Sequence, residues 1–135
     1  MPIAWSNHAW PQLTLAESLA ILRGVGLSNW VHDLGNVEGR DAAEIALPDL
    51  GEIKLIAVSF ASTMAEAADF ELAKAIVRMA ARRQTPVVNL HVLVAMQEFA
   101  SLPDPLVGNL LRLADVAAAG NVVICLDSSS GLGGS

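Results

Sequence analysis

The chain has 135 residues, which suits one domain, and 53% of them are apolar, which is enough to bury a core. No apolar run reaches the roughly 18 residues of a membrane span, and no basic segment precedes an apolar stretch at the N-terminus, so we expect a cytoplasmic protein with no membrane partner. The net charge is −6 and no run of Lys and Arg is longer than Arg82 and Arg83, so we also expect no nucleic-acid partner.

The first part of the chain predicts two strands and two helices. Residues 3–5 are a short apolar start. Residues 14–25 open with the capping box Thr-Leu-Ala-Glu and continue with apolar residues at helical spacing, which predicts a helix. Residues 30–34 predict a strand. Residues 41–47 predict a short helix, which the next residue, a proline, ends.

The second part continues the alternation with stronger signals. Residues 54–60 predict a strand that is rich in β-formers. Residues 69–83 predict the clearest helix, with arginines towards its C-terminal half. Residues 86–94 predict a strand, and residues 105–119 a helix with proline in its first turn and glycine beyond its end. Residues 121–127 predict a fifth strand. It holds the only cysteine, which we expect to be buried.

Strands that alternate with helices predict parallel strands joined by right-handed crossovers. We therefore expect an α/β fold in residues 1–127, a parallel (βα) repeat like strands 1–5 of a TIM barrel that stops before the barrel closes. Residues 128–135 then form a Ser/Gly-rich loop or a truncated end. The alternative is a flavodoxin-like doubly wound sheet, although the chain ends on a strand with no helix after it.

Polar residues stand where each expected strand ends. In parallel α/β folds, active sites form at the carboxyl ends of the strands. All three histidines of the chain fall on or just after such ends. The polar residues at these positions are Ser6, Asn7, His8, His32, Asp33, Ser59, Asn89, His91, Asp127 and Ser128.

The fourth and fifth expected strands carry the most informative pair. Side chains alternate along a strand, so an apolar face towards the helices places Asn89 and His91 on the inner face, with Asp127 beside them. An imidazole next to a carboxylate is either a partial site for a divalent metal or an acid–base pair. A structural histidine and a turn-capping aspartate are the alternatives. Since His32 and Asp33 are adjacent, only one of them can point inward.

Four segments together resemble the xylose-isomerase-like barrel family of sugar-phosphate isomerases and epimerases, which also includes endonuclease-IV-type enzymes. Residues 14–34 are similar to the family's first helix and second strand, and residues 54–59 to its third strand. Residues 69–91 (DFELAKAIVRMAARRQTPVVNLH) are the best match, to its third helix and fourth strand. Residues 113–127 resemble the run into its fifth strand.

The resemblance implies a divalent metal (Mn, Mg, Zn or Co) and proton transfer between adjacent carbons of a small sugar or sugar phosphate. It implies that His91 and Asp127 are catalytic and that Asp127 is a metal ligand, in a position that is usually Glu followed by Asn. It further implies that His8, His32 and Asn89 contact the substrate. The family's remaining ligands come from later strands, so the resemblance implies that this chain is inactive on its own.

We therefore expect the N-terminal part of a metal-dependent sugar (phosphate) isomerase or epimerase. An incomplete barrel would leave residues 122–127 as an exposed apolar edge, which favours self-association. The alternative is a non-catalytic, flavodoxin-like domain that binds a small ligand or a partner. A third reading, endonuclease chemistry on DNA, is opposed by the low Lys and Arg content.

Overall fold

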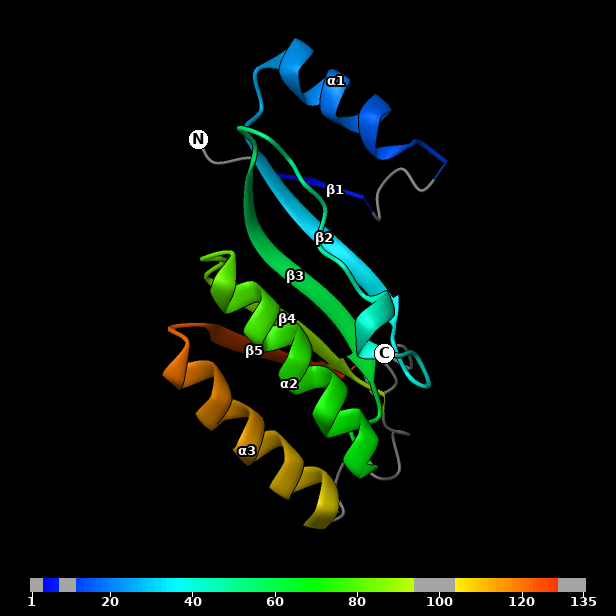
Figure 1. Cartoon of the computed structure of the whole chain (residues 1–135), viewed down its shortest axis with the longest axis vertical. Helices are drawn as coiled ribbons and strands as arrows, with labels where there is room; N and C mark the ends of the chain where they lie inside the picture. Colours follow the sequence, from blue (N-terminus) through cyan, green and yellow to red (C-terminus); the bar gives the residue numbers. More distant parts are fainter. Residues whose placement is uncertain (1–3, 8–11, 94–103, 129–135) are drawn as a thin grey trace.

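The computed structural model of the chain describes residues 4–7, 12–93 and 104–128. Strands and helices alternate along these residues, as expected, except between β2 and β3, where the chain forms only a short 3-10 helix (Figure 1). In chain order the elements are β1 (Ala4–Ser6), α1 (Leu15–Val25), β2 (Asn29–Asn36), η1 (Ala42–Glu44), β3 (Lys54–Ser62), α2 (Ala67–Arg82), β4 (Val87–Val92), α3 (Asp104–Ala119) and β5 (Val123–Ser128).

The strands form one five-stranded, all-parallel sheet in the order β1-β2-β3-β4-β5. Each strand pairs with the strand before it in the sequence, which is the order of neighbouring strands in a barrel wall. In the flavodoxin-like order the first strand lies inside the sheet, whereas β1 lies at an edge here. As far as the described ranges show, the sheet is open, with β1 and β5 as its outer strands.

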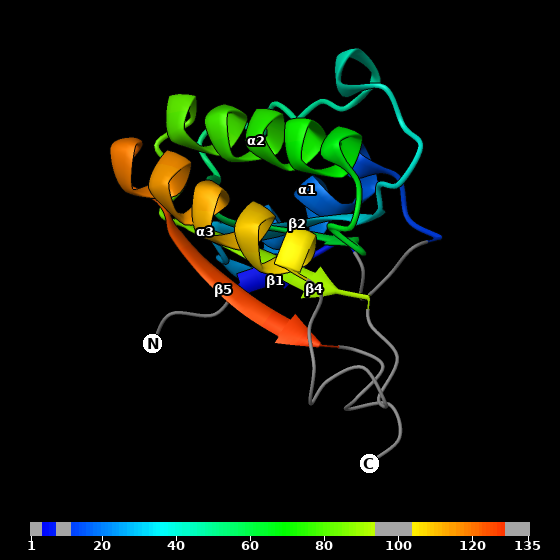
Figure 2. The same ribbon diagram turned by 90° about the horizontal axis from the view of Figure 1, so that it is seen from below.

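Helices α2 and α3 lie side by side over one face of the sheet (Figure 2). The core lies between them and the strands, where Phe60, Ile76 and Leu90 are almost fully buried. Helix α1 adds Leu19 and Leu22 to the same core. Among the described residues, no helix covers the opposite face of the sheet. None of the helices in the described ranges is long and apolar enough to cross a membrane.

The helices expected at residues 69–83 and 41–47 have different outcomes. The helix expected at residues 69–83 is confirmed as α2, in which Ala73, Ile76, Val77 and Ala80 form an apolar face with no exposed surface. The helix expected at residues 41–47 is wrong, because the chain makes only η1 there. The Asp41 carboxylate accepts a 3.0 Å hydrogen bond from the amide of Ala43, which caps a single turn. The backbone is extended again at Ile45, and the proline three residues later prevents the helix from resuming.

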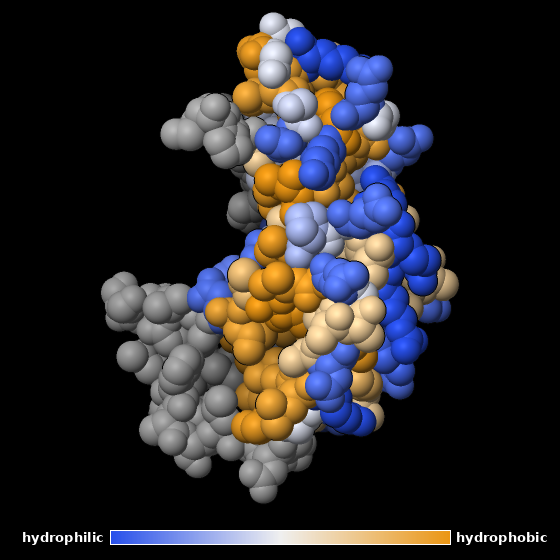
Figure 3. Space-filling model, turned by 90° about the vertical axis from the view of Figure 1, so that its left-hand side faces the viewer, coloured by the Kyte–Doolittle hydropathy of each residue, from blue (hydrophilic) through white to orange (hydrophobic). Residues whose placement is uncertain are grey.

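The fifth strand is more exposed than the sequence suggested. Cys125, expected to be buried, is exposed. Its side chain points to the face that no described helix covers, and within the described residues β5 has a neighbouring strand on one side only. Val123, on the same face as Cys125, is 61% exposed, and Leu126, on the helix side of this outer strand, is 54% exposed. A space-filling view shows further hydrophobic surface at the α1 end of the molecule, where Val25 is 64% exposed (Figure 3).

Candidate functional site

The uncovered face of the sheet carries polar side chains near the carboxyl ends of its strands. The register aligns Asp33 with Ser59, Ser59 with Asn89, and His91 with Asp127. Because side chains alternate along a strand, these residues share one face. The residues between them in β3 and β4 point the other way and are buried under the helices. The sequence pattern of β4 predicted this arrangement for Asn89, His91 and Asp127.

A bulge in β3 sets the orientation of Ser59. One extra residue, Ile56, stands between the partner of Trp30 and the partner of Val31. Leu55 is buried in the core on the helix side, and uninterrupted alternation would place Ser59 on that side too. The extra residue reverses the alternation. Ser59 therefore faces the same side as Asp33.

A pocket of about 310 Å³ opens on this face, where the first four strands end. Its volume is at the lower end of the range for small-molecule sites. Hydroxyl, carboxylate, amide and imidazole groups converge on it from four different strands, which suits a small ligand with several hydroxyl groups. The lining residues are Ser6, Asp33, Gly35, Asn36, Ser59, Phe60, Ala61 and His91.

Asp33 is fixed at the pocket by its own turn and by the end of β1. Its Oδ1 accepts a 3.0 Å hydrogen bond from the amide of Gly35, which has a φ of +72° that favours glycine. Asn7 makes two bonds to the backbone of Asp33: its Nδ2 donates to the carbonyl at 2.9 Å, and its Oδ1 accepts from the amide at 2.6 Å. The ends of β1 and β2 are thereby joined next to the pocket.

His91 and Asp127 lie side by side on β4 and β5. Nδ1 of His91 is 3.2 Å from Oδ2 of Asp127, and each side chain is 45% exposed. The two atoms are within ion-pair distance, but the buried Nδ1 has no hydrogen-bond partner among the described residues. An imidazole oriented by a carboxylate is a common arrangement for general acid–base catalysis.

The metal site that the resemblance implies is not complete in the described part of the chain. Nowhere in it do three or more His, Cys, Asp or Glu side chains lie close enough to hold a metal ion. His91 and Asp127 would supply two ligands. Catalytic zinc sites use three protein ligands, so these residues do not by themselves fit the metal.

The remaining predicted substrate contacts are separated by the fold. His32 lies on the helix side of β2, where its Nδ1 accepts a 3.1 Å hydrogen bond from Nε1 of Trp30. It does not line the pocket. Asn89 shares the face of the pocket and donates a 3.3 Å hydrogen bond to Oγ of Ser59. It lies two residues before His91, farther from the carboxyl end of β4, and does not line the pocket. His8 lies outside the described residues.

The burial of His32 has an electrostatic consequence. Desolvation lowers the pKa of His32 below its usual value, and the nearby Asp33 carboxylate opposes part of that shift. The hydrogen bond from Trp30 also requires an unprotonated Nδ1. Both effects favour the neutral imidazole, which suits a structural histidine.

Sequence reasoning assigned no role to several residues that line the pocket. Ser6, Asp33 and Ser59 were recognised only as polar residues near strand ends. Gly35 carried a usable signal, because the Asp-x-Gly sequence of residues 33–35 favours a local bond from the aspartate to the backbone two residues on, which here interrupts the regular pairing of β2 near its end.

The chain matches no protein-family model, and no curated protein matches it in sequence.

Proposed function

We propose that this chain is the N-terminal part of a metal-dependent sugar (phosphate) isomerase or epimerase. The observation that supports the proposal best is the His91–Asp127 pair, with 3.2 Å between Nδ1 and Oδ2, on the same face as the polar pocket. An acid–base group beside a small polar pocket at the carboxyl end of a parallel sheet is the usual location of such chemistry.

In the proposed reaction, His91 moves one proton between adjacent carbons. The imidazole removes the proton from the hydroxyl-bearing carbon next to a carbonyl; the electron pair of that C–H bond forms a carbon–carbon double bond, and the π pair of the carbonyl moves onto its oxygen, which gives an enediolate. A proton passes from the hydroxyl oxygen to this oxygen, and the imidazolium then returns its proton, or one exchanged with solvent, to the neighbouring carbon as the new carbonyl forms. Asp127 orients the imidazole and stabilises it while it is protonated. Ser6, Asp33 and Ser59 would hold the hydroxyl groups of the substrate.

The metal ion in this proposal is supported only by the family resemblance. His91 and Asp127 are its candidate ligands in the described residues, and they are too few to hold it alone. A metal ion bound there with further ligands would polarise the substrate carbonyl. The proton transfer proposed for His91 does not depend on that step.

The proposal is tested by following solvent exchange rather than complete turnover. The purified chain is incubated in D₂O with a panel of aldose and ketose phosphates, with and without Mn²⁺, and NMR follows deuterium at the carbons next to the carbonyl. Complete turnover is not expected of this chain alone, because the family's remaining ligands come from later strands, but we expect this partial exchange reaction with at least one sugar phosphate. His91→Gln should lower its rate by about 10²–10⁴-fold, the usual contribution of a general base. Asp127→Asn should also lower it.

Arg23→Ala, a surface change on α1 away from the pocket, is the matched control and should exchange at the wild-type rate. Exchange that survives His91→Gln unchanged would remove His91 from the mechanism. If the chain binds sugar phosphates without catalysing any exchange, the non-catalytic binding domain becomes the better description.

A further inference from the structure

The pocket at the carboxyl ends of the first four strands carries negative charge. Among the residues that line it, Asp33 supplies a carboxylate, and the imidazole of His91 lies beside a second carboxylate, that of Asp127. The other polar side chains of the lining are neutral hydroxyl and amide groups, from Ser6, Asn36 and Ser59. These groups can hydrogen-bond to the hydroxyl groups of a sugar, and the carboxylates oppose a negatively charged ligand.

The positive charges of the chain lie away from this pocket. None of its eight Lys and Arg residues lines the pocket, and all eight fall within the ranges that the structure describes. The segments outside those ranges contain no Lys or Arg. The position of every basic side chain of this chain is therefore known, and the net charge of −6 adds to the negative field at the pocket.

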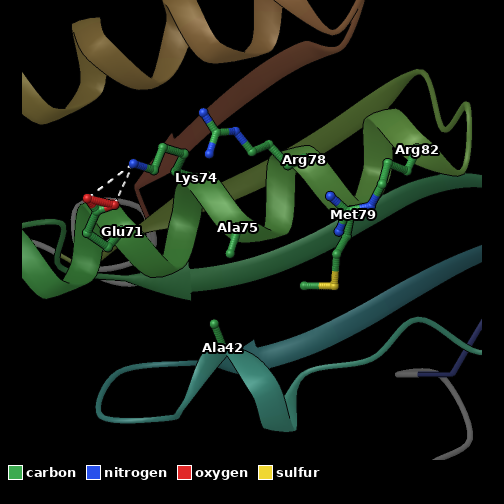
Figure 4. Close-up of a pocket in the computed structure, with 7 residues that line it drawn as sticks. All are labelled: Ala42, Glu71, Lys74, Ala75, Arg78, Met79 and Arg82. Atoms are coloured by element: carbon green, nitrogen blue, oxygen red, sulfur yellow. Dashed lines mark hydrogen bonds and ion pairs between the residues drawn. The ribbon is translucent and has the colours of Figure 1, made fainter.

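Most of these cations lie in the helix layer, on the opposite face of the sheet from the pocket. Arg83 donates a 2.7 Å hydrogen bond to the carbonyl of Pro48, and the guanidinium carbon of Arg112 lies 4.2 Å from the centre of the Phe70 ring. Three more, on α2, surround a groove of about 240 Å³ between α2 and η1 (Figure 4): Lys74, Arg78 and Arg82.

The remaining basic residues lie at the two ends of the sheet. Lys54 is the first residue of β3, and Arg23 lies close to Gly51, just before that strand, so both are at the amino ends of the strands. Arg40 approaches the rim of the pocket. Its Nη1 donates a 3.2 Å hydrogen bond to the carbonyl of Leu34, which stands between two lining residues.

We infer that the pocket binds an unphosphorylated sugar in preference to its phosphate ester, and that Asp33 determines this preference. The inference rests on the proposed function, which supplies the sugar. A carboxylate accepts hydrogen bonds from sugar hydroxyl groups but repels a phosphate monoester, which carries nearly two negative charges. Hydrogen bonds with Asn7 and Gly35 hold Asp33 in place. A sugar phosphate then binds with its phosphate directed out of the open pocket, and with lower affinity.

The test compares D-ribose with D-ribose 5-phosphate, and D-fructose with D-fructose 6-phosphate. Saturation-transfer-difference NMR titrations at low salt give the dissociation constant of each. We expect each free sugar to bind about tenfold more tightly than its phosphate, the effect of a doubly charged group near one carboxylate at a partly hydrated site. Added salt should narrow this ratio, because it screens the repulsion.

Asp33→Asn keeps the oxygen that accepts from the amide of Gly35 and removes the charge. It should tighten phosphate binding and reduce the ratio to about twofold. Asp115→Asn, at an exposed position on α3, is the matched control and should keep the wild-type ratio. Circular dichroism verifies that both variants are folded. An equal fall of the ratio in the two variants would be an effect of net charge and would overturn the inference.

Two other outcomes would also overturn the inference. One is tighter binding of the phosphates than of the free sugars, and its loss in Arg40→Ala would make Arg40 the phosphate contact. The other is no binding of either kind of sugar. The proposed function fails separately, when neither kind exchanges deuterium, and in that case the binding ratio still decides the role of Asp33.

Discussion

His32 and Asp33 are neighbours in β2 with opposite surroundings. Asp33 faces the pocket and His32 packs against Trp30 on the helix side. The sequence predicted that only one of them could point inward, because side chains alternate along a strand. It could not predict which one, since that depends on how β2 pairs with its neighbours. In the structure the Asp33 carboxylate lines the pocket, and the His32 imidazole lies on the side of the sheet that packs against the helices.

The buried imidazole predicts a pH dependence of stability. Burial lowers the pKa of His32 in the folded protein, so the unfolded chain binds this proton more readily. The stabilising contribution is therefore complete above the unfolded value of 6.5 and is lost as the pH falls from there towards the folded value. We expect the urea midpoint to decrease between about pH 7.5 and about pH 5.5.

His32→Gln should reduce that decrease, because glutamine accepts the hydrogen bond from Trp30 without titrating. His91→Gln is the control and should retain the contribution of His32. An unchanged pH profile in His32→Gln would show that this histidine does not carry the effect.

At the scale of the elements, α2 lies tightly against the chain just beyond the C-terminal end of α3. A Cβ placed on Gly120 would stand 2.8 Å from Cβ of Ala81, which is too short for two carbon atoms. Glycine is therefore required there by the neighbouring helix rather than by its own backbone. The turn from α3 into β5 depends on this close approach.

Gly120→Ala should destabilise the protein by about 1–3 kcal/mol, the usual effect of overpacking. Gly108→Ala, within α3 and with nothing near its added Cβ, should instead be neutral or stabilising by up to about 1 kcal/mol. Combining Gly120→Ala with Ala81→Gly should recover part of the loss in a double-mutant cycle. Urea unfolding measures these three variants and the single variant Ala81→Gly, and additive effects in the cycle would contradict the contact.

Local sequence patterns predicted the helices and strands. The orientation and exposure of individual side chains depended on how the strands pair in the sheet. The apolar face of α2 and the alternation in β4 depend on neighbouring residues in the sequence, so both were predictable. The bulge at Ile56 depends on the register between β2 and β3, and it alone brings Ser59 to the pocket. The exposure of Cys125 depends on the position of β5 at the edge. An apolar run looks the same in an edge strand and in a central one.

At the scale of the whole molecule, the open edge at β5 is the feature with the clearest physical cost. Val123 and Leu126 of this strand, and Leu111 of α3, are each more than half exposed. An edge strand also presents backbone groups that can pair with another chain. We therefore propose self-association through this edge.

Analytical ultracentrifugation at two protein concentrations should detect concentration-dependent dimers of the wild type. Val123→Lys and Leu126→Lys should shift the protein towards the monomer, because a charged edge resists strand pairing. Ala46→Lys, at an exposed position in the segment between β2 and β3, adds the same charge and should leave the distribution unchanged. Dimers that persist in both edge variants would place the association elsewhere.

The sequential strand order has a kinetic consequence. Each strand pairs with the strand that precedes it in the chain, so a single crossover connection separates the two members of every pair. The sequence separation of the contacts is therefore small for a parallel sheet. The sheet can therefore grow strand by strand while the ribosome extends the chain. At each stage of synthesis the newest strand is paired on one side and open on the other, and among the described residues β5 keeps the open side that β2, β3 and β4 lose when the next strand pairs with them.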